Sequence, residues 1–239
     1  MLLVGGGLLA GTVNAVAGAG SILTVPLLVL AGVPGNHANG SNRVGILTSN
    51  AAAAVSFRRL GVRGLRSALP ILVPVVAGAV VGSFTIGRIT DGTFERLFGL
   101  LVFPLVILAL RRPNVVVDAE PWSLGATVAT FTAIGLYGGA VQAGIGLVLL
   151  AALARTGYDL VSANNIKSVV NLSITVAALP FFIARDEVEW APALVLAAGF
   201  TIGGWVGAHA AVKGGERLLR WTMVAAAVAL SARMLGLYG

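Results

Sequence analysis

Two glycine-rich turns, each preceded by an amide side chain, have residue types suited to binding a small anion. Asn14 precedes Gly18-Ala19-Gly20-Ser21, and Gln142 precedes Gly144-Ile145-Gly146. Glycines here would break a helix and leave backbone N–H and C=O groups that hydrocarbon cannot satisfy. A helix that begins at such a break points its N–H groups at the gap, which favours a negative charge. The turns therefore predict an anion site; the alternative is that their glycines only permit close helix packing.

Two cations inside otherwise apolar segments, Arg43 and Lys167, strengthen this prediction. A charge within a membrane is costly enough to indicate a functional site by default. The alternative is that each side chain extends to a lipid headgroup. Nearby asparagines would complete a polar pocket. The predicted substrate-binding residues are Asn14, Gly18, Gly20, Ser21, Asn39, Asn42, Arg43, Gln142, Gly144, Gly146, Asn164 and Lys167, and we predict no catalytic residue and no metal ligand.

The carboxylates are separate from the predicted pocket, since all nine occur in expected loops or at expected helix ends. His37 and His209 also lie near segment ends, where a lone histidine is usually structural. With buried cations and no buried carboxylate, the substrate itself is expected to supply the negative charge. An inside-negative potential favours anion exit by about 2.3 kcal/mol per charge per 100 mV, so export requires no coupling ion in principle.

The composition indicates that a bilayer surrounds these residues. Of 239 residues, 57% are hydrophobic and 10% charged, and the mean hydropathy is +0.95. Four uncharged or nearly uncharged runs are long enough to cross about 30 Å of hydrocarbon as helices. The net charge of +7 sits mostly in short loops between them, which favours membrane topology over a nucleic-acid partner. These runs cover residues 1–42, 67–87, 121–154 and 190–212.

The chemistry of an enzyme is not evident in the sequence. There is no cysteine, which excludes thiolate nucleophiles, disulfides and thiolate metal sites. The sequence contains no motif that matches a phosphate-binding loop, a zinc-protease helix or a hydrolase nucleophile elbow. We therefore expect neither an enzyme nor a bound cofactor.

An internal duplication organises the chain. Residues 7–14 match 135–142, and Ala17-Gly18-Ala19-Gly20 matches Ala143-Gly144-Ile145-Gly146. Gly32 followed by Ala38-Asn39 matches Gly157 followed by Ala163-Asn164. Further on, the spacing of Gly78 and Gly82 recurs at Gly199 and Gly203, where we expect close helix packing. Four ordered matches predict two repeats. The predicted domains are residues 1–112, a connecting loop at 113–121, and residues 122–239.

Each repeat is expected to contain a helix ending at the glycine turn, a short apolar segment and three longer helices. The short segments cover only about 15 Å, so we expect half-helices or re-entrant pieces. The predicted ranges are 2–17, 21–31, 38–57, 66–87 and 94–110 in the first repeat, and 122–143, 145–154, 160–183, 190–212 and 217–237 in the second.

The basic loops bear on topology, because cytoplasmic loops are enriched in Lys and Arg. Five crossings per half would invert the second half and place ten basic residues inside and four outside. Four crossings per half would leave the halves parallel, with eight inside and six outside. We favour the inverted arrangement with broken helices at the midplane, a recurrent transporter plan, and leave the parallel one open.

The motifs resemble those of the sulfite exporter TauE/SafE family of bacterial membrane permeases. The resemblance covers almost the whole chain and rests on G-L-L-A-G-T-V-N-A-V-A-G-A-G at residues 7–20, then Pro26, Gly32-Val33-Pro34 and Ala38-Asn39, and a weaker copy at 135–163. It implies export of sulfite or small organosulfur anions across the bacterial cytoplasmic membrane, without a bound cofactor. It also implies seven or eight spans, closer to the parallel count.

Two departures between the repeats make their half-sites chemically unequal. Gln142 stands where the first repeat has Asn14, and Leu147 where it has Ser21. Besides a transporter, the same residues are compatible with a passive anion channel or a nontransporting membrane scaffold. Homo-oligomerisation is left open, because lipid-facing and subunit-facing surfaces have similar composition.

Overall fold

The computed structural model describes residues 2–62, 65–110, 122–155 and 158–213, and this part of the chain is all helical. Four of its helices are long and apolar enough to cross a membrane, α4, α5, α8 and α9. The protein is therefore an α-helical membrane protein, as predicted. The helices are α1 (Leu2–Ala17), α2 (Gly20–Leu30), α3 (Gly35–Arg59), α4 (Leu65–Ile86), α5 (Asp91–Leu110), α6 (Leu124–Ala140), α7 (Ile145–Leu153), α8 (Leu160–Ala184) and α9 (Trp190–Val212).

The observed helices follow the predicted ones closely, with three local corrections. α5 begins at Asp91, three residues before its predicted start at 94, because the Thr90 hydroxyl accepts a hydrogen bond from the Thr93 amide and caps the helix there. α3 begins three residues earlier than predicted, because the extended Pro34 lets the helix start directly after it. α6 ends at Ala140 rather than at 143, because Gln142 and Gly144 both have φ of 59°, which a right-handed helix excludes. The predicted helix at 217–237 and the connecting loop at 113–121 lie outside the described residues.

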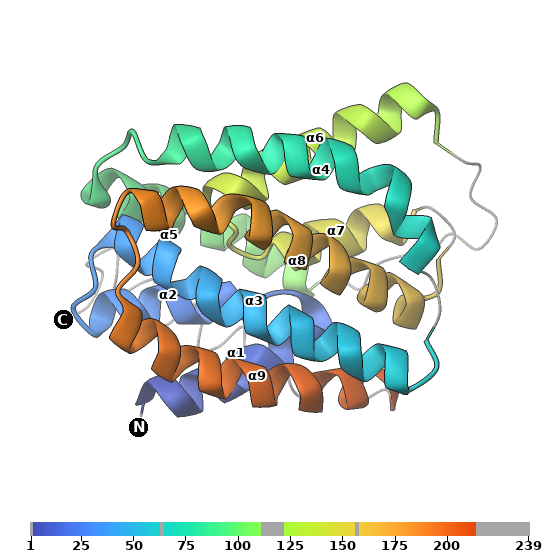
Figure 1. The fold of residues 1–239 in the computed structure, drawn as a ribbon, viewed down its shortest axis with the longest axis horizontal. Coiled ribbons are helices and arrows are strands. Elements are labelled where there is room, and N and C mark those ends of the chain that lie inside the picture. Colours follow the sequence, from blue (N-terminus) through green and yellow to red (C-terminus); the bar gives the residue numbers. More distant parts are fainter. Residues whose placement is uncertain (1, 63–64, 111–121, 156–157, 214–239) are drawn as a thin grey trace.

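The first glycine turn reverses the chain. Gly18 has φ of 74°, a left-handed conformation that glycine adopts readily, and α2 begins two residues later. Gly20 lies against Ala10 and Asn14, and Gly6 lies near Leu27, so α2 runs back along α1. In Figure 1 the α1–α2 hairpin opens toward one end of the molecule and the α6–α7 pair toward the other. The short segment α2 therefore returns toward the start of α1.

Two glycine-lined helix pairs flank the molecule. α1 packs against α9, with Gly7 beside Leu196 and Gly11 beside Phe200. α4 packs against α6 through Gly78 and Gly82, where any added Cβ would collide with the α6 backbone. Within each pair the helices are parallel, and the two pairs run in opposite directions (Figure 1). The sequence-based expectation of close packing at these glycines is confirmed.

Long helices α3 and α8 lie between these pairs and carry most of the buried polar side chains. On α3 the buried set includes Asn39, Asn42 and Arg43, and on α8 it includes Lys167 and Asn171. Because lipid cannot satisfy such groups, both helices present them to the protein interior. The polar centre is thus enclosed by apolar helices.

Asp159→Ala is expected to destabilise the start of α8 by about 1 kcal/mol. The Asp159 carboxylate accepts hydrogen bonds from the amides of Val161 and Ser162, each at 3.0 Å, and its bonding to Ser162 lowers its pKa. A lowered folded-state pKa stabilises the protein above the unfolded pKa of about 4, and this contribution disappears as the pH falls through the folded value.

Thermal unfolding of wild type and Asp159→Ala at pH 7 and at low pH measures this contribution. The difference between the two proteins should shrink in acid. An equal difference at both pH values would show that the carboxylate is not the capping group.

Candidate functional site

The two predicted glycine turns meet inside the protein. The Gly146 amide donates a hydrogen bond to the Gly18 carbonyl at 3.1 Å, and the two backbones lie so close that a Cβ on either glycine would collide with the other. Ser21 joins them further, since its hydroxyl donates to the Gln142 carbonyl and accepts from the Gly144 amide, both at 3.1 Å. The tips of the two hairpins therefore form one buried junction.

In this junction, some of the backbone amides that were predicted to bind an anion already donate hydrogen bonds to the protein. The Gly144 and Gly146 amides, expected to face an anion, donate to groups of the first hairpin. Gly20 packs on α1. The two turns thus lie together, and the amides of the second turn have protein partners.

The two amide side chains before the turns have different surroundings. Asn14 donates to the Ser49 hydroxyl at 3.4 Å, whereas Gln142 donates to Thr175 at 2.6 Å and to Asn171 at 3.3 Å. All of these residues are buried. The two half-sites are chemically unequal, as the sequence difference indicates.

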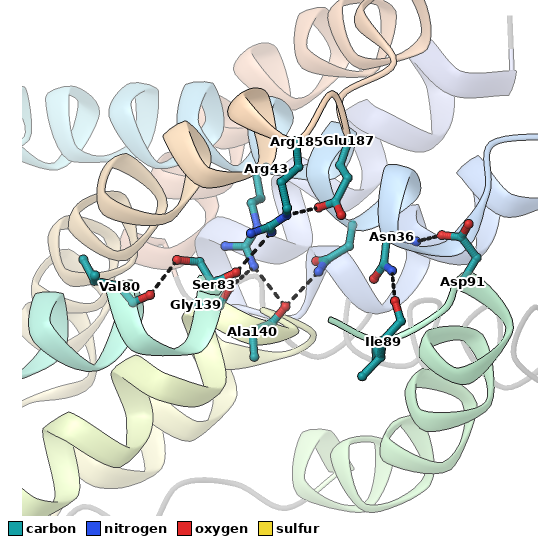
Figure 2. Close-up of polar contacts among 11 residues, drawn as sticks. Asn36, Arg43, Val80, Ser83, Ile89, Asp91, Gly139, Ala140, Arg185 and Glu187 are labelled. Carbon is teal, nitrogen blue, oxygen red and sulfur yellow. Dashed lines mark hydrogen bonds and ion pairs between the residues drawn. The ribbon is translucent and has the colours of Figure 1, made fainter. Parts of the chain in front are cut away.

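Arg43 of α3 caps the end of α6. Its guanidinium has no exposed surface and donates to the carbonyls of Gly138, Gly139 and Ala140 at 3.2, 2.5 and 3.3 Å. Figure 2 shows it against Gly139 and Ala140. Asn39 adds a bond to the Ala140 carbonyl at 2.8 Å. Helix C-termini expose unpaired carbonyls and carry about half a negative charge, so a buried cation is favourable there.

Lys167 of α8 caps the end of α1 in the same way. Its ammonium group is fully buried and donates to the carbonyls of Asn14 and Ala15 at 2.8 and 2.9 Å, and to Asn164 Oδ1 at 2.9 Å. Each cation thus stabilises the broken helix of the other half. The alternative that these side chains extend to headgroups is wrong, because both are directed to buried carbonyls.

A family model described as "Sulfite exporter TauE/SafE" matches residues 3–234. The chain belongs to the TauE/SafE family. Its relatives include a probable membrane transporter protein of Sinorhizobium sp., 28% identical over 95% of this chain and 88% of the relative, and another of Haemophilus influenzae, 26% identical over 95% and 91%. A third, from Escherichia coli K12, is 24% identical over 95% and 86%. No solved structure matches.

Family membership and the helices together identify this TauE/SafE protein as a multi-pass membrane transporter. The family resemblance inferred from the sequence is confirmed. The comparisons are those of a permease family and are consistent with a nonenzymatic role.

The polar centre of this TauE/SafE protein retains hydrogen-bonding capacity. Three buried donors, Asn42 Nδ2, Asn171 Nδ2 and Arg43 Nε, have no partner among the described residues, and neither do buried amide oxygens such as Asn39 Oδ1 and Gln142 Oε1. Asn42 contacts Thr24 of α2, one turn beyond Ser21, and Asn171 contacts Gln142. Since buried donors usually have partners, these three mark places where a ligand or water would bind.

Sequence reasoning missed three residues beside Arg43. The guanidinium carbon of Arg43 lies 4.3 Å from the centre of the Phe182 ring, and that of Arg185 lies 5.1 Å from the same centre. Glu187, expected in a solvated loop, is 9% exposed and pairs with Arg185 at 3.1 Å. The expectation of no buried carboxylate is therefore wrong, because the α8–α9 loop folds inward against Gly40. No local sequence signal distinguishes this loop from an exposed one.

Proposed function

We propose that this protein exports sulfite or a related small organosulfur oxyanion across the bacterial cytoplasmic membrane. The description of its family supports the substrate class, and the names of its relatives support transport. The observation that carries the proposal is the set of buried, unpartnered donors beside the hairpin junction, on Asn42, Asn171 and Arg43. Unpartnered donors suit an oxyanion, whose oxygens accept hydrogen bonds.

The electrostatics of the same region support an anion. Each helix C-terminus contributes about half a negative charge, while the cation bound to it contributes a full positive one. Arg43 and Lys167 therefore leave a net positive potential around the junction after capping α6 and α1. Such a potential in a low-dielectric interior attracts a small anion more strongly than it would in water.

We further propose that the halves are inverted repeats, with residues 1–112 and 122–239 as the units and the hairpin breaks near the membrane midplane. Three observations support this arrangement. The hairpins open to opposite ends, the α1–α9 and α4–α6 pairs run in opposite directions, and the cation of each half caps the other half's hairpin. If both hairpins are re-entrant, the described first half crosses the membrane three times, through α3, α4 and α5. An odd number of crossings gives the second half the opposite orientation in the membrane.

The proposed substrate-binding set is the twelve residues predicted above together with Asn171, whose Nδ2 has no partner among the described residues, with roles divided between them. Asn42 and Arg43 would contact the anion directly through their unpartnered donors. Lys167 and Asn164 would act through the potential and by holding α1. Gly18, Gly20, Gly144 and Gly146 would give the hairpin tips the shape that the junction requires.

Sulfite efflux from proteoliposomes under an imposed membrane potential tests this function. Wild type should transport, and Asn42→Ala and Asn171→Ala should lower the apparent affinity roughly ten- to hundredfold, the worth of one charge-assisted hydrogen bond. Ser173→Ala is the matched control, since its hydroxyl bonds only within α8, to the Val169 carbonyl. No wild-type flux of sulfite or related oxyanions would overturn the proposal.

The same vesicles separate a transporter from a passive channel. Alternating access predicts saturable flux that is stimulated by sulfite on the opposite side, because the loaded site returns faster than the empty one. A channel would give flux without counterflow stimulation. That result would retain the anion pathway and replace the transport mechanism.

A further inference from the structure

We infer that Arg185 joins Arg43 in a two-arginine anion subsite, in which the Glu187 carboxylate occupies the place that the transported anion takes. This inference rests on the proposed function and adds a specific subsite to it. Figure 2 shows the two arginines side by side, with Glu187 on Arg185 and the α6 carbonyls beneath Arg43.

The geometry places two positive charges around one aromatic ring. The guanidinium carbons of Arg43 and Arg185 lie 4.3 and 5.1 Å from the centre of Phe182. Arg185 also donates to the Ser83 carbonyl at 3.1 Å, which fixes it against the end of α4. Phe182 is fully buried and Arg185 is 25% exposed. Both cations are thus anchored rather than free to separate.

The charges of this cluster are incompletely balanced. Two guanidinium groups carry two positive charges, and Glu187, whose carboxylate accepts from Arg185 Nε at 3.1 Å, supplies one negative charge. Arg43 is under the electrostatic influence of both Arg185 and Glu187, and its own Nε has no partner among the described residues. Like charges held this close favour any additional anion. The cluster is therefore an anion site with a resident carboxylate.

Glu187 is also part of the loop that covers Arg43. The α8–α9 loop is attached to α3, since the Glu189 amide donates to the Ser41 hydroxyl at 2.8 Å and the Glu187 carbonyl packs on Gly40. Val188, between these contacts, is only 5% exposed. Arg185, the residue after α8, binds Glu187 two residues later and is itself fixed to the Ser83 carbonyl of α4. An oxyanion that replaces the carboxylate on Arg185 removes this link between Glu187 and α4, so anion binding and loop release are coupled.

Sulfite binding to the purified full-length protein in nanodiscs, measured by titration calorimetry, tests the subsite. Glu187→Gln removes the competing charge and should tighten sulfite binding about tenfold or more. Arg185→Gln should weaken it roughly ten- to hundredfold, and Arg185→Lys should recover part of the loss. Arg59→Gln is the control, because Arg59 is the last residue of α3, about 24 Å along that helix from Arg43, and stacks on Trp205.

Labelling of a single cysteine provides an independent readout, because the chain contains no natural cysteine. In the Val188→Cys protein, maleimide labelling should be slow without ligand and several-fold faster with sulfite. Adding Glu187→Gln should make it fast without ligand. A labelling rate of the Val188→Cys protein that does not change with saturating sulfite would overturn the coupling.

The outcomes also separate this inference from the proposed function. If wild type binds and transports sulfite while Arg185→Gln keeps its affinity, or Glu187→Gln binds more weakly, the subsite is wrong and the transporter assignment stands. If wild type neither binds nor transports sulfite or related oxyanions, the proposed function fails and the subsite with it. If Glu187 had a purely structural role, Glu187→Gln would bind sulfite more weakly than wild type, whereas the subsite predicts tighter binding.

Discussion

Gly146→Ala is expected to abolish transport and to prevent the protein from reaching its native state. A Cβ at position 146 would collide with the backbone of Gly18, and a backbone cannot rotate away as a flexible side chain can. The collision would also separate the Gly146 amide from the Gly18 carbonyl, to which it donates at 3.1 Å. We expect a cost above about 3 kcal/mol, at the upper end of overpacking effects.

The yield of monodisperse protein and its thermal unfolding temperature measure this effect. Gly5→Ala is the matched control, because position 5 lies in α1 with no atom within 4 Å of an added Cβ. That control should be neutral or stabilising, since alanine is a better helix former than glycine by up to about 1 kcal/mol. Wild-type yield and unfolding temperature in Gly146→Ala would contradict the close contact of the hairpin tips.

Replacing either buried cation is expected to loosen the hairpin of the opposite half. Lys167→Gln removes the ammonium group that bonds to Asn14 and Ala15, more than 150 residues away in sequence. Arg43→Gln removes the guanidinium from the end of α6. Each change should cost about 2 to 4 kcal/mol, because a glutamine amide makes fewer and uncharged hydrogen bonds to the same carbonyls.

Hydrogen exchange locates the loosening. In Lys167→Gln, faster exchange is expected at the end of α1, and in Arg43→Gln at the end of α6. Lys213→Gln is a control for loss of a lysine charge, since Lys213 is exposed beyond the end of α9. Increased exchange confined to the helix that carries each substitution would show that the reciprocal capping does not hold the hairpins.

The helices themselves were predictable because the signals that define them are local. Apolar length predicts α4, α8 and α9 almost to the residue, and the glycines after Ala17 mark the end of α1. Membrane protein helices follow hydropathy closely, since every backbone group must bond within its own segment. The start of α3 was missed by three residues, because its first turn is polar and lacks a hydropathy signal.

Several polar residues of the candidate site could be identified from the sequence, but their contacts could not. Asn14, Arg43, Gln142 and Lys167 stand out in the sequence because polar groups are expensive in apolar segments. Their partners do not stand out. The sequence alone left both cations available to an anion, whereas the structure gives them the carbonyls of the opposite hairpin.

The sequence by itself thus determined the class of protein, most of the helix limits, the family and several polar residues of the centre, since composition and spacing carry these properties. Only the tertiary structure decided that α2 turns back along α1, that Gly18 meets Gly146, and that Glu187 is buried beside Arg185. These contacts join residues from different helices. Chain direction after a glycine turn and burial of a loop depend on packing between distant segments, which local propensity does not encode.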